Sequence, residues 1–216
     1  MDVFEIENEF YRQAHPSRFS KFLAHAKLYE MSLGLPGDFV ECGVFKGASF
    51  CRFRKLASLF HPDHARKFVG FDVFGRFPDA DIKEDEAELQ RQFTIDGDTG
   101  IDVEELRKII KDQGLDGNVE LVKGDVRVTL PEYFNDHQDM ALSIVNIDLD
   151  LYGPVKVALE VLFPKVVRGG IIILDDYAAG FPGANKAVEE FMAENGRKER
   201  IQKFPWTYTP AFIIKE

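Results

Sequence analysis

The stretch IVNIDLDLYGP, residues 144–154, is an apolar run that ends in two aspartates spaced one residue apart. A second apolar run, IIILDDY at 171–177, ends in two adjacent aspartates about one strand–helix–strand unit later. The second run has no polar face, which is typical of a parallel strand buried on both sides. Because the carboxyl ends of parallel strands meet at one edge of a sheet, we expect the four aspartates to lie at the same edge.

Strand and helix patterns alternate over residues 39–195, on both sides of this stretch. The other main strands are expected at 39–42, 67–72 and 119–125. This alternation predicts an α/β fold with a mostly parallel, doubly wound sheet that carries helices on both faces. Residues 201–204 and 211–216 are expected to close the fold as an antiparallel hairpin. The whole chain, 1–216, is expected to form one domain.

Apolar spacing and chain breakers place the helices. Residues 5–33 have helix-like spacing and should be divided into two helices by Pro16. Residues 80–113 resemble two acidic helices. A helix that starts near Gly153 should run as far as the Arg-Gly-Gly sequence at 168–170, which is expected to end it.

The composition excludes several functional classes. The chain has 216 residues, 45% of them hydrophobic, and a net charge of −10, which argues against nucleic-acid binding. No apolar run approaches the roughly 18 residues that a membrane helix requires. The two cysteines, Cys42 and Cys51, form no CxxC pair and are expected to be reduced thiols. We therefore expect a cytoplasmic protein without nucleic-acid or membrane partners.

Acidic residues stand at the end of every main strand. They are Glu41, Asp72, Asp125, Asp148 and Asp175. Asp and Glu make up 37 of the 216 residues, so chance alone would seldom place an acid at all these positions. In open parallel sheets, ligands bind beyond the carboxyl ends of the strands, so these acids mark the expected ligand site.

The first strand runs into ECGVFKG, an acid-x-Gly-x-x-x-Gly loop that opens a helix. A dinucleotide fingerprint needs glycine where Phe45 stands, so a pyrophosphate is disfavoured. Asp72 could accept both hydroxyls of a ribose. Asp125 could accept from an adenine amino group, or it could simply cap the next helix. Acids facing an amine and a sulfonium suit S-adenosylmethionine. The residues expected around this cofactor are Glu41, Cys42, Gly43, Val44, Gly47, Ser49, Asp72, Asp125 and Val126.

Several motifs in this order resemble the macrocin O-methyltransferase family, which methylates sugar hydroxyls. The resemblance covers residues 34–191, and its most specific part is the combination DLDLY…GG…DDY. It implies a class I methyltransferase (Rossmann-like) fold with a seven-stranded sheet, S-adenosylmethionine as methyl donor, and a divalent metal, usually Mg²⁺. The loop with Glu41, Gly43 and Gly47 would then bind the methionine side of the cofactor, Asp72 the ribose and Asp125 the adenine. By the same resemblance, the metal ligands would be Asp148, Asp175 and Asp176.

Helix capping would explain one acid per strand but not four aspartates together, because such carboxylates repel one another unless a cation lies between them. Asp148, Asp150 or a metal-bound hydroxide could accept the proton from the substrate. A phosphohydrolase of the haloacid dehalogenase type also uses apolar-DxD and apolar-DD segments, but its nucleophile motif opens the fold. A non-catalytic subunit that binds S-adenosylmethionine is a further alternative, although it would not need the aspartate pair at 175–176.

The remaining segments suggest how substrate and partners are held. Residues 1–33 are expected to form a lid or an oligomerisation segment, and residues 78–115 an acidic helical insertion. The sequence TIDGDTGIDVEE at 94–105 partly matches a calcium loop but lacks its first Asp and its turn Gly, so a solvated helix connection is favoured. The expected substrate is a sugar or another vicinal diol, and the expected assembly is a homodimer.

Overall fold

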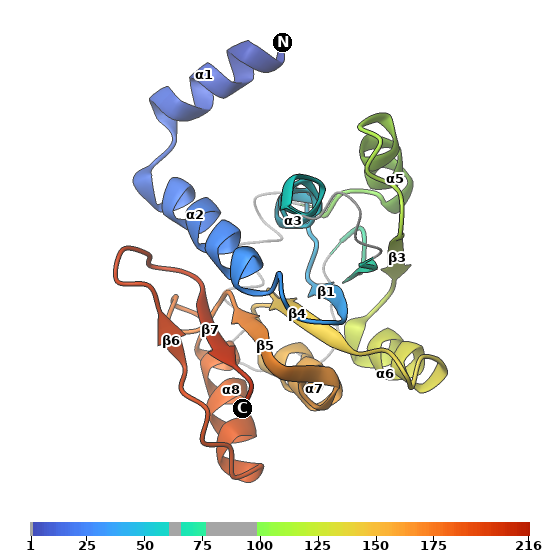
Figure 1. Ribbon diagram of the computed structural model, residues 1–216, viewed down its shortest axis with the longest axis vertical. Helices are drawn as coiled ribbons and strands as arrows, with labels where there is room; N and C mark the ends of the chain where they lie inside the picture. Colours follow the sequence, from blue (N-terminus) through green and yellow to red (C-terminus); the bar gives the residue numbers. More distant parts are fainter. Residues whose placement is uncertain (1, 61–65, 77–98) are drawn as a thin grey trace.

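A seven-stranded sheet with the order β3-β2-β1-β4-β5-β7-β6 organises the protein (Figure 1). The computed structural model describes residues 2–60, 66–76 and 99–216. The strands are β1 (Asp38–Cys42), β2 (Phe68–Asp72), β3 (Val119–Lys123), β4 (Leu142–Ile147), β5 (Val166–Leu174), β6 (Gln202–Lys203) and β7 (Ala211–Ile214). The first five run parallel, whereas β7 pairs antiparallel with both β5 and β6. The predicted mixed sheet with an antiparallel C-terminal end is therefore confirmed.

The strand order reverses between β1 and β4. The chain moves outward from β1 to β2 and β3, and then returns to place β4 on the other side of β1, with Cys42 opposite Ile147. In doubly wound sheets the crevice beyond this reversal is the usual ligand site. The expected strand-end acids therefore meet where the topology opens a crevice.

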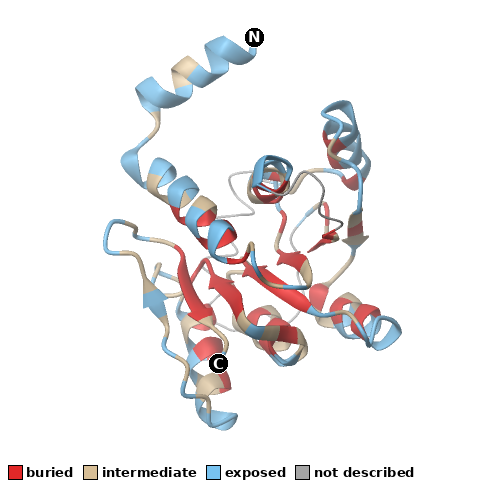
Figure 2. Cartoon of the chain, viewed as in Figure 1, coloured by how far each residue is buried: buried red, intermediate tan, exposed pale blue. Residues whose placement is uncertain are grey.

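Helices cover both faces of the sheet (Figures 1 and 2). The helices of the described residues are α1 (Val3–Gln13), which stands away from the sheet, and α2 (Pro16–Met31), α3 (Ala48–Phe60), α5 (Val103–Asp112), α6 (Val126–Asp136), α7 (Tyr152–Leu162) and α8 (Pro182–Glu194). Helices α6, α7 and α8 form one hydrophobic core with the sheet, and α2, α3 and α5 form the other. Neighbouring residues of β1 enter opposite cores, Phe39 with α3 and Val40 with α7, as strand geometry requires.

The core on the α3 face is rich in phenylalanine. Phe39 contacts Phe53 and Phe68 with ring centroids 4.8 Å apart in both pairs, and Phe50 packs edge-to-face on Phe39. All four rings are buried. Burying each ring contributes roughly 1.5–3 kcal/mol, so this cluster fixes α3, and the loop that precedes it, against the sheet.

One expected boundary is wrong. The helix that starts near Gly153 ends at Leu162, and a short 3-10 turn at Phe163–Lys165 leads into β5 at Val166. The Arg-Gly-Gly sequence at 168–170 lies inside this strand, where the pairing with β4 shifts register. Gly169 has a φ of +80°, so the glycines accommodate a bulge instead of ending a helix.

The expected break of the N-terminal segment at Pro16 is confirmed, because α1 ends at Gln13 and Pro16 starts α2. Helix α5 corresponds to one of the two helices expected within 80–113, and residues 77–98 lie outside the described residues. The calcium-loop match also falls largely outside them, while Asp102 caps α5 by accepting from the backbone N–H groups of Glu104 and Glu105. In the part of the chain that the structure describes, no helix is both long and apolar enough to span a membrane.

Candidate active site

A cavity of about 450 Å³ opens at the carboxyl ends of the parallel strands. Most of the predicted site residues line it: Gly43, Val44, Ser49, Asp72, Asp125, Val126, Asp148, Asp150, Asp175 and Asp176. The other three, Glu41, Cys42 and Gly47, are buried and are not part of the cavity wall. Gly47 instead packs on α5, where an added Cβ would lie 2.7 Å from a methyl group of Leu106.

Gly43 brings the loop after β1 against the loop after β4. Its φ is +89°, and an added Cβ would lie 1.6 Å from the carbonyl oxygen of Asp148. No other residue fits such a contact. The loop after β1 and the loop that carries Asp148 therefore form one tightly packed wall.

Asp72 connects the loops after β1 and β2. Its carboxylate accepts hydrogen bonds from the backbone N–H of Phe45 at 2.9 Å and of Phe74 at 2.7 Å. Both phenylalanines have positive φ values, which are uncommon for residues other than glycine. A carboxylate can accept about four hydrogen bonds, so Asp72 retains capacity for ligand hydroxyls at the cavity surface.

Asp125 is the N-cap of α6, as one of the two interpretations of the sequence expected. It accepts from the backbone N–H of Arg127 at 2.9 Å, and the Arg127 guanidinium binds both of its oxygens. Hydrogen bonding to Arg127 lowers the pKa of Asp125. Arg127 was not predicted, although it also lines the cavity.

Glu41 lies beneath the cavity floor. Its Oε1 accepts from Asn146 Nδ2 at 3.0 Å, and its Oε2 has no partner among the described residues. Burial raises the pKa of Glu41 to about 8, against the opposing effect of Ser49 and Asn146. A buried carboxyl group with an unsatisfied oxygen is the kind of group that a ligand amine would complete.

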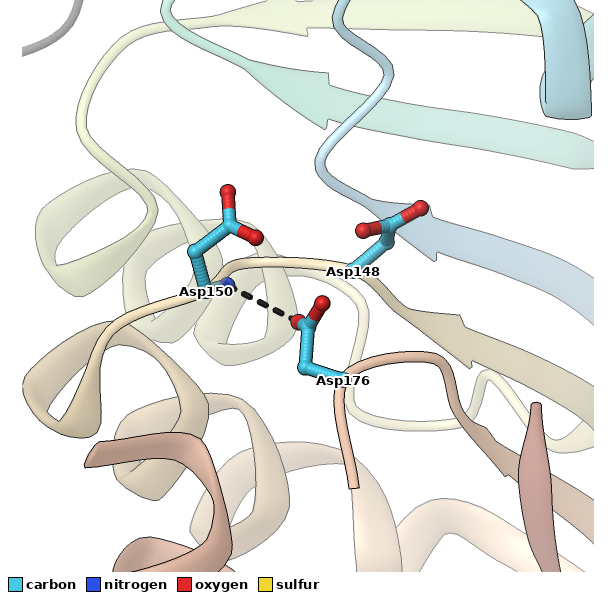
Figure 3. Close-up of side chains that lie close together, drawn as sticks. All are labelled: Asp148, Asp150 and Asp176. Carbon is cyan, nitrogen blue, oxygen red and sulfur yellow. Dashed lines mark hydrogen bonds between the residues drawn. The ribbon is translucent and has the colours of Figure 1, made fainter. Parts of the chain in front are cut away.

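Three carboxylates gather at the ends of β4 and β5 (Figure 3). Asp148, Asp150 and Asp176 each place an oxygen within 4.8 Å of the others. Asp176 Oδ2 accepts from the backbone N–H of Asp150 at 2.9 Å and of Leu149 at 3.1 Å, which holds the Asp-x-Asp loop against it. Burial and the neighbouring acids raise the pKa values of all three carboxyl groups, that of Asp150 to about 7.

The structure groups the aspartates differently from the predicted metal set Asp148, Asp175 and Asp176. Asp175 forms an ion pair with Lys21 Nζ at 2.6 Å, and His25 Nε2 lies 3.9 Å from its other oxygen. Although burial alone would raise the pKa of Asp175, His25 and Lys21 lower it to about 2. Successive residues at a strand end point to opposite sides, so Asp175 reaches α2 while Asp176 reaches the other carboxylates.

Helices α2 and α3 contribute basic residues that were not predicted: Arg18, Lys21, His25 and Arg52. Lys21, Arg18 and Arg52 line the cavity, and Lys21 Nζ also lies 3.7 Å from Asp148 Oδ2. His25 is fully buried, hydrogen-bonds to Arg52 at 3.1 Å, and has its pKa lowered by burial to about 4. The spacing of 18, 21 and 25 places these residues on one helix face, a signal that the sequence offered.

Comparisons with known proteins identify the family of the chain. The family model for macrocin-O-methyltransferase (TylF) matches residues 21–210. The chain is 29% identical over 187 residues, 82% of its length, to an 8-demethyl-8-(2,3-dimethoxy-alpha-L-rhamnosyl)-tetracenomycin-C 4'-O-methyltransferase of Streptomyces olivaceus. It is 30% identical over 167 residues, 74% of its length, to demethyldecarbamoylnovobiocin O-methyltransferase of Streptomyces niveus. These matches span 68% and 60% of the two relatives.

Solved structures share the fold. The O-methyltransferase NovP superposes with a TM-score of 0.78 at 24% identity, over 90% of this chain and 78% of NovP. The calicheamicin methyltransferase CalS11 has a TM-score of 0.74 at 23% identity, over 99% of this chain and 86% of CalS11. The class I methyltransferase fold is thereby confirmed, and the phosphohydrolase alternative has no support. The chain belongs to the macrocin-O-methyltransferase (TylF) family of S-adenosylmethionine-dependent O-methyltransferases.

Proposed function

We propose that this protein transfers the methyl group of S-adenosylmethionine to a sugar hydroxyl, assisted by a divalent cation. The observation that carries the proposal is the group of three carboxylates in the same cavity as the glycine loop after β1. The named activities of the relatives, a rhamnosyl 4'-O-methyltransferase and a mycinamicin III 3''-O-methyltransferase, support a sugar as the acceptor.

The chemistry of the carboxylates fits a hard dication such as Mg²⁺. Asp148, Asp150 and Asp176 offer oxygen ligands only, and their raised pKa values reflect burial and mutual repulsion that a cation would remove. Lys21 already neutralises Asp175. We therefore propose Asp148, Asp150 and Asp176 as the ligands, in place of the set that includes Asp175.

When bound, the cation would lower the pKa of the acceptor hydroxyl and help to orient its oxygen. Asp148 and Asp150 each have a second carboxylate oxygen, and one of these oxygens accepts the hydroxyl proton. The sugar oxygen then forms a bond to the methyl carbon as the bond from sulfur to that carbon breaks, which leaves S-adenosylhomocysteine. The close contact at Gly43 supports the transfer by holding the cofactor loop against the carboxylates.

The part of the cavity beside the loop after β1 would bind S-adenosylmethionine. Glu41 would receive the cofactor's amine, Asp72 its ribose hydroxyls, and Asp125 with Val126 its adenine. The loop residues Cys42, Gly43, Val44, Gly47 and Ser49 would shape this half, with Cys42 and Gly47 acting from beneath the surface.

The test compares Asp176→Asn with the wild-type protein. We expect the variant to lose methyl transfer at least about 100-fold while it binds S-adenosylmethionine with unchanged affinity, because Asp176 lies in the carboxylate cluster. Treatment with EDTA should reduce wild-type activity to the same level, and Mg²⁺ should restore it. Full activity after EDTA treatment would contradict the metal role, and lost cofactor binding in the variant would contradict the proposed division of the cavity.

We also propose that α1 mediates a homodimer. Among its residues, Val3, Phe4, Ile6, Phe10 and Tyr11 are exposed, and the helix buries no side chain. Figure 1 shows α1 standing away from the sheet, and isolated helices of its length are marginal in water. A cytoplasmic location is part of the same proposal, supported by the free thiols Cys42 and Cys51.

A further inference from the structure

The cavity wall formed by α2 and α3 is basic. Arg18 and Lys21 of α2 and Arg52 of α3 line the cavity together. The three basic side chains therefore share one wall of the cavity, in a chain whose net charge is −10.

Among the described residues, only one of these three cations forms a close ion pair with an acid of the protein. This cation is Lys21, whose Nζ lies 2.6 Å from Asp175 Oδ2. The Arg52 side chain hydrogen-bonds to the ring nitrogen of His25 at 3.1 Å and not to a carboxylate. Within residues 2–60, 66–76 and 99–216, no hydrogen bond or ion pair engages the Arg18 side chain, which is exposed at the cavity. The charge that Arg18 and Arg52 present is thus available to a ligand.

We propose that Arg18 and Arg52 bind a phosphoryl group of the acceptor, so that the substrate is a phosphorylated sugar of the nucleotide-activated class. This inference rests on the proposed function, since it assigns a substrate class to the same cavity. Guanidinium groups match phosphate oxygens in a bidentate geometry, which favours arginine for this task.

The position of the basic wall indicates that the anion it binds belongs to the substrate and not to the cofactor. Lys21 bridges toward the carboxylates, with its Nζ 3.7 Å from Asp148 Oδ2. Arg18 lies three residues earlier on the same helix, about 4.5 Å along its axis at 1.5 Å per residue. An anion bound there lies near the aspartates that would activate the hydroxyl.

The experiment measures binding of inorganic pyrophosphate by calorimetry in metal-free buffer with EDTA, to wild type, Arg18→Gln and Arg168→Gln. Arg168 is an exposed arginine at the start of β5 that does not line the cavity, and it serves as the matched control. We expect Arg18→Gln to weaken pyrophosphate binding about tenfold or more, since a charged hydrogen bond is lost, and the control to leave it unchanged. S-adenosylmethionine affinity should be equal in all three proteins.

A second arm measures methyl transfer to a panel of nucleoside-diphosphate deoxysugars and the corresponding free sugars. Arg18→Gln should raise the KM for the nucleotide sugar by a similar factor with little change in kcat. The inference is overturned if wild type does not bind pyrophosphate, if Arg18→Gln loses cofactor affinity instead, or if only free sugars are methylated. The last result would leave the proposed methyl transfer intact, whereas no methyl transfer to any sugar, with pyrophosphate binding retained, would count against the proposed function alone.

Discussion

At Gly43 the loop after β1 packs directly against the backbone of the loop after β4. We expect Gly43→Ala to lower the free energy of unfolding by more than about 3 kcal/mol, because the new Cβ would overlap the Asp148 carbonyl oxygen at 1.6 Å. Urea denaturation would measure this change. Gly180→Ala is a matched control, because Gly180 has a similar φ of +96° but no atom within 4 Å of an added Cβ.

Gly180→Ala should lower the free energy of unfolding by only about 1 kcal/mol, because its Cβ causes backbone strain but no clash. If the two alanine variants lost equal stability, backbone strain alone would explain the need for Gly43. The close contact with Asp148 would then have no energetic consequence.

Glu41 makes stability depend on pH. Burial raises its pKa in the folded chain from 4.5 to about 8, so between these values the folded chain keeps a proton that the unfolded chain has released. The free energy of unfolding should therefore fall as pH rises from about 5 to 8, by up to about 1.4 kcal/mol per pH unit from this group. Denaturation in EDTA at several pH values would measure the slope.

Asp148, Asp150 and Asp176 also have raised pKa values and act in the same direction, so the comparison must be made with Glu41→Gln. The variant keeps a neutral side chain at every pH and should have a shallower slope than wild type. Identical slopes would show that Glu41 is ionised in the folded chain.

At the scale of elements, the ion pair between Lys21 and Asp175 joins α2 to the end of β5. Replacing it by methionine would leave Asp175 buried without a cation, so Lys21→Met should lower the free energy of unfolding by about 3–5 kcal/mol. Chemical denaturation at neutral pH in EDTA would measure the loss. Lys27→Met is the control on the same helix, since Lys27 pairs with Glu30 at the exposed surface and should contribute less than about 1 kcal/mol.

Adding Asp175→Asn to Lys21→Met should restore much of the stability, because it removes the uncompensated charge. If the double variant were no more stable than Lys21→Met, the loss would come from packing of the lysine stem. The ion pair would then not be what joins the two elements.

The elements differ in how far sequence alone could predict them. Strands such as β1 and β2 follow from short apolar runs ended by an acid, and they were placed to within one residue. The start of β5 was missed because Gly169 and Gly170 mark a bulge here, while the same residues commonly end helices. The acids at the strand ends could be predicted for the same reason as the strands, because both follow from the local order of apolar and acidic residues in the sequence.

The grouping of the acids could not be predicted locally. Asp175 and Asp176 are adjacent in sequence, and only the position of α2 decides that one of them meets Lys21 while the other meets Asp150. Arg18 and Lys21 were missed because nothing near them in sequence indicates a cavity. Their shared helix face is visible in the sequence, but the element that it faces is not.

At the scale of the whole molecule, the exposed apolar side of α1 predicts self-association. Light scattering coupled to gel filtration should find a dimer for the full chain and a monomer after residues 2–13 are deleted. Phe4→Glu should also give a monomer. Phe4 is 68% exposed on α1, so the glutamate that replaces it would bring a buried charge into the dimer interface. Leu59→Glu is the control, as Leu59 is similarly exposed, at 75%, but lies on α3 and not on α1.

A dimer that survived the deletion of residues 2–13 would assign the contact to another surface. A monomeric full-length chain would show instead that the apolar side of α1 has a different partner. Either result leaves the description of the cavity unchanged, since α1 contributes no residue to its lining.

The contact between Lys21 and Asp175 joins positions 154 residues apart in the chain. Such a contact closes a very long loop, and the entropic cost of long-range closure places contacts of this kind late in folding. During synthesis, α2 emerges well before its partner on β5 has been translated. The cavity wall that joins α2 to the end of β5 therefore cannot form until β5 has been translated, so a nascent chain that lacks β5 has no complete ligand site.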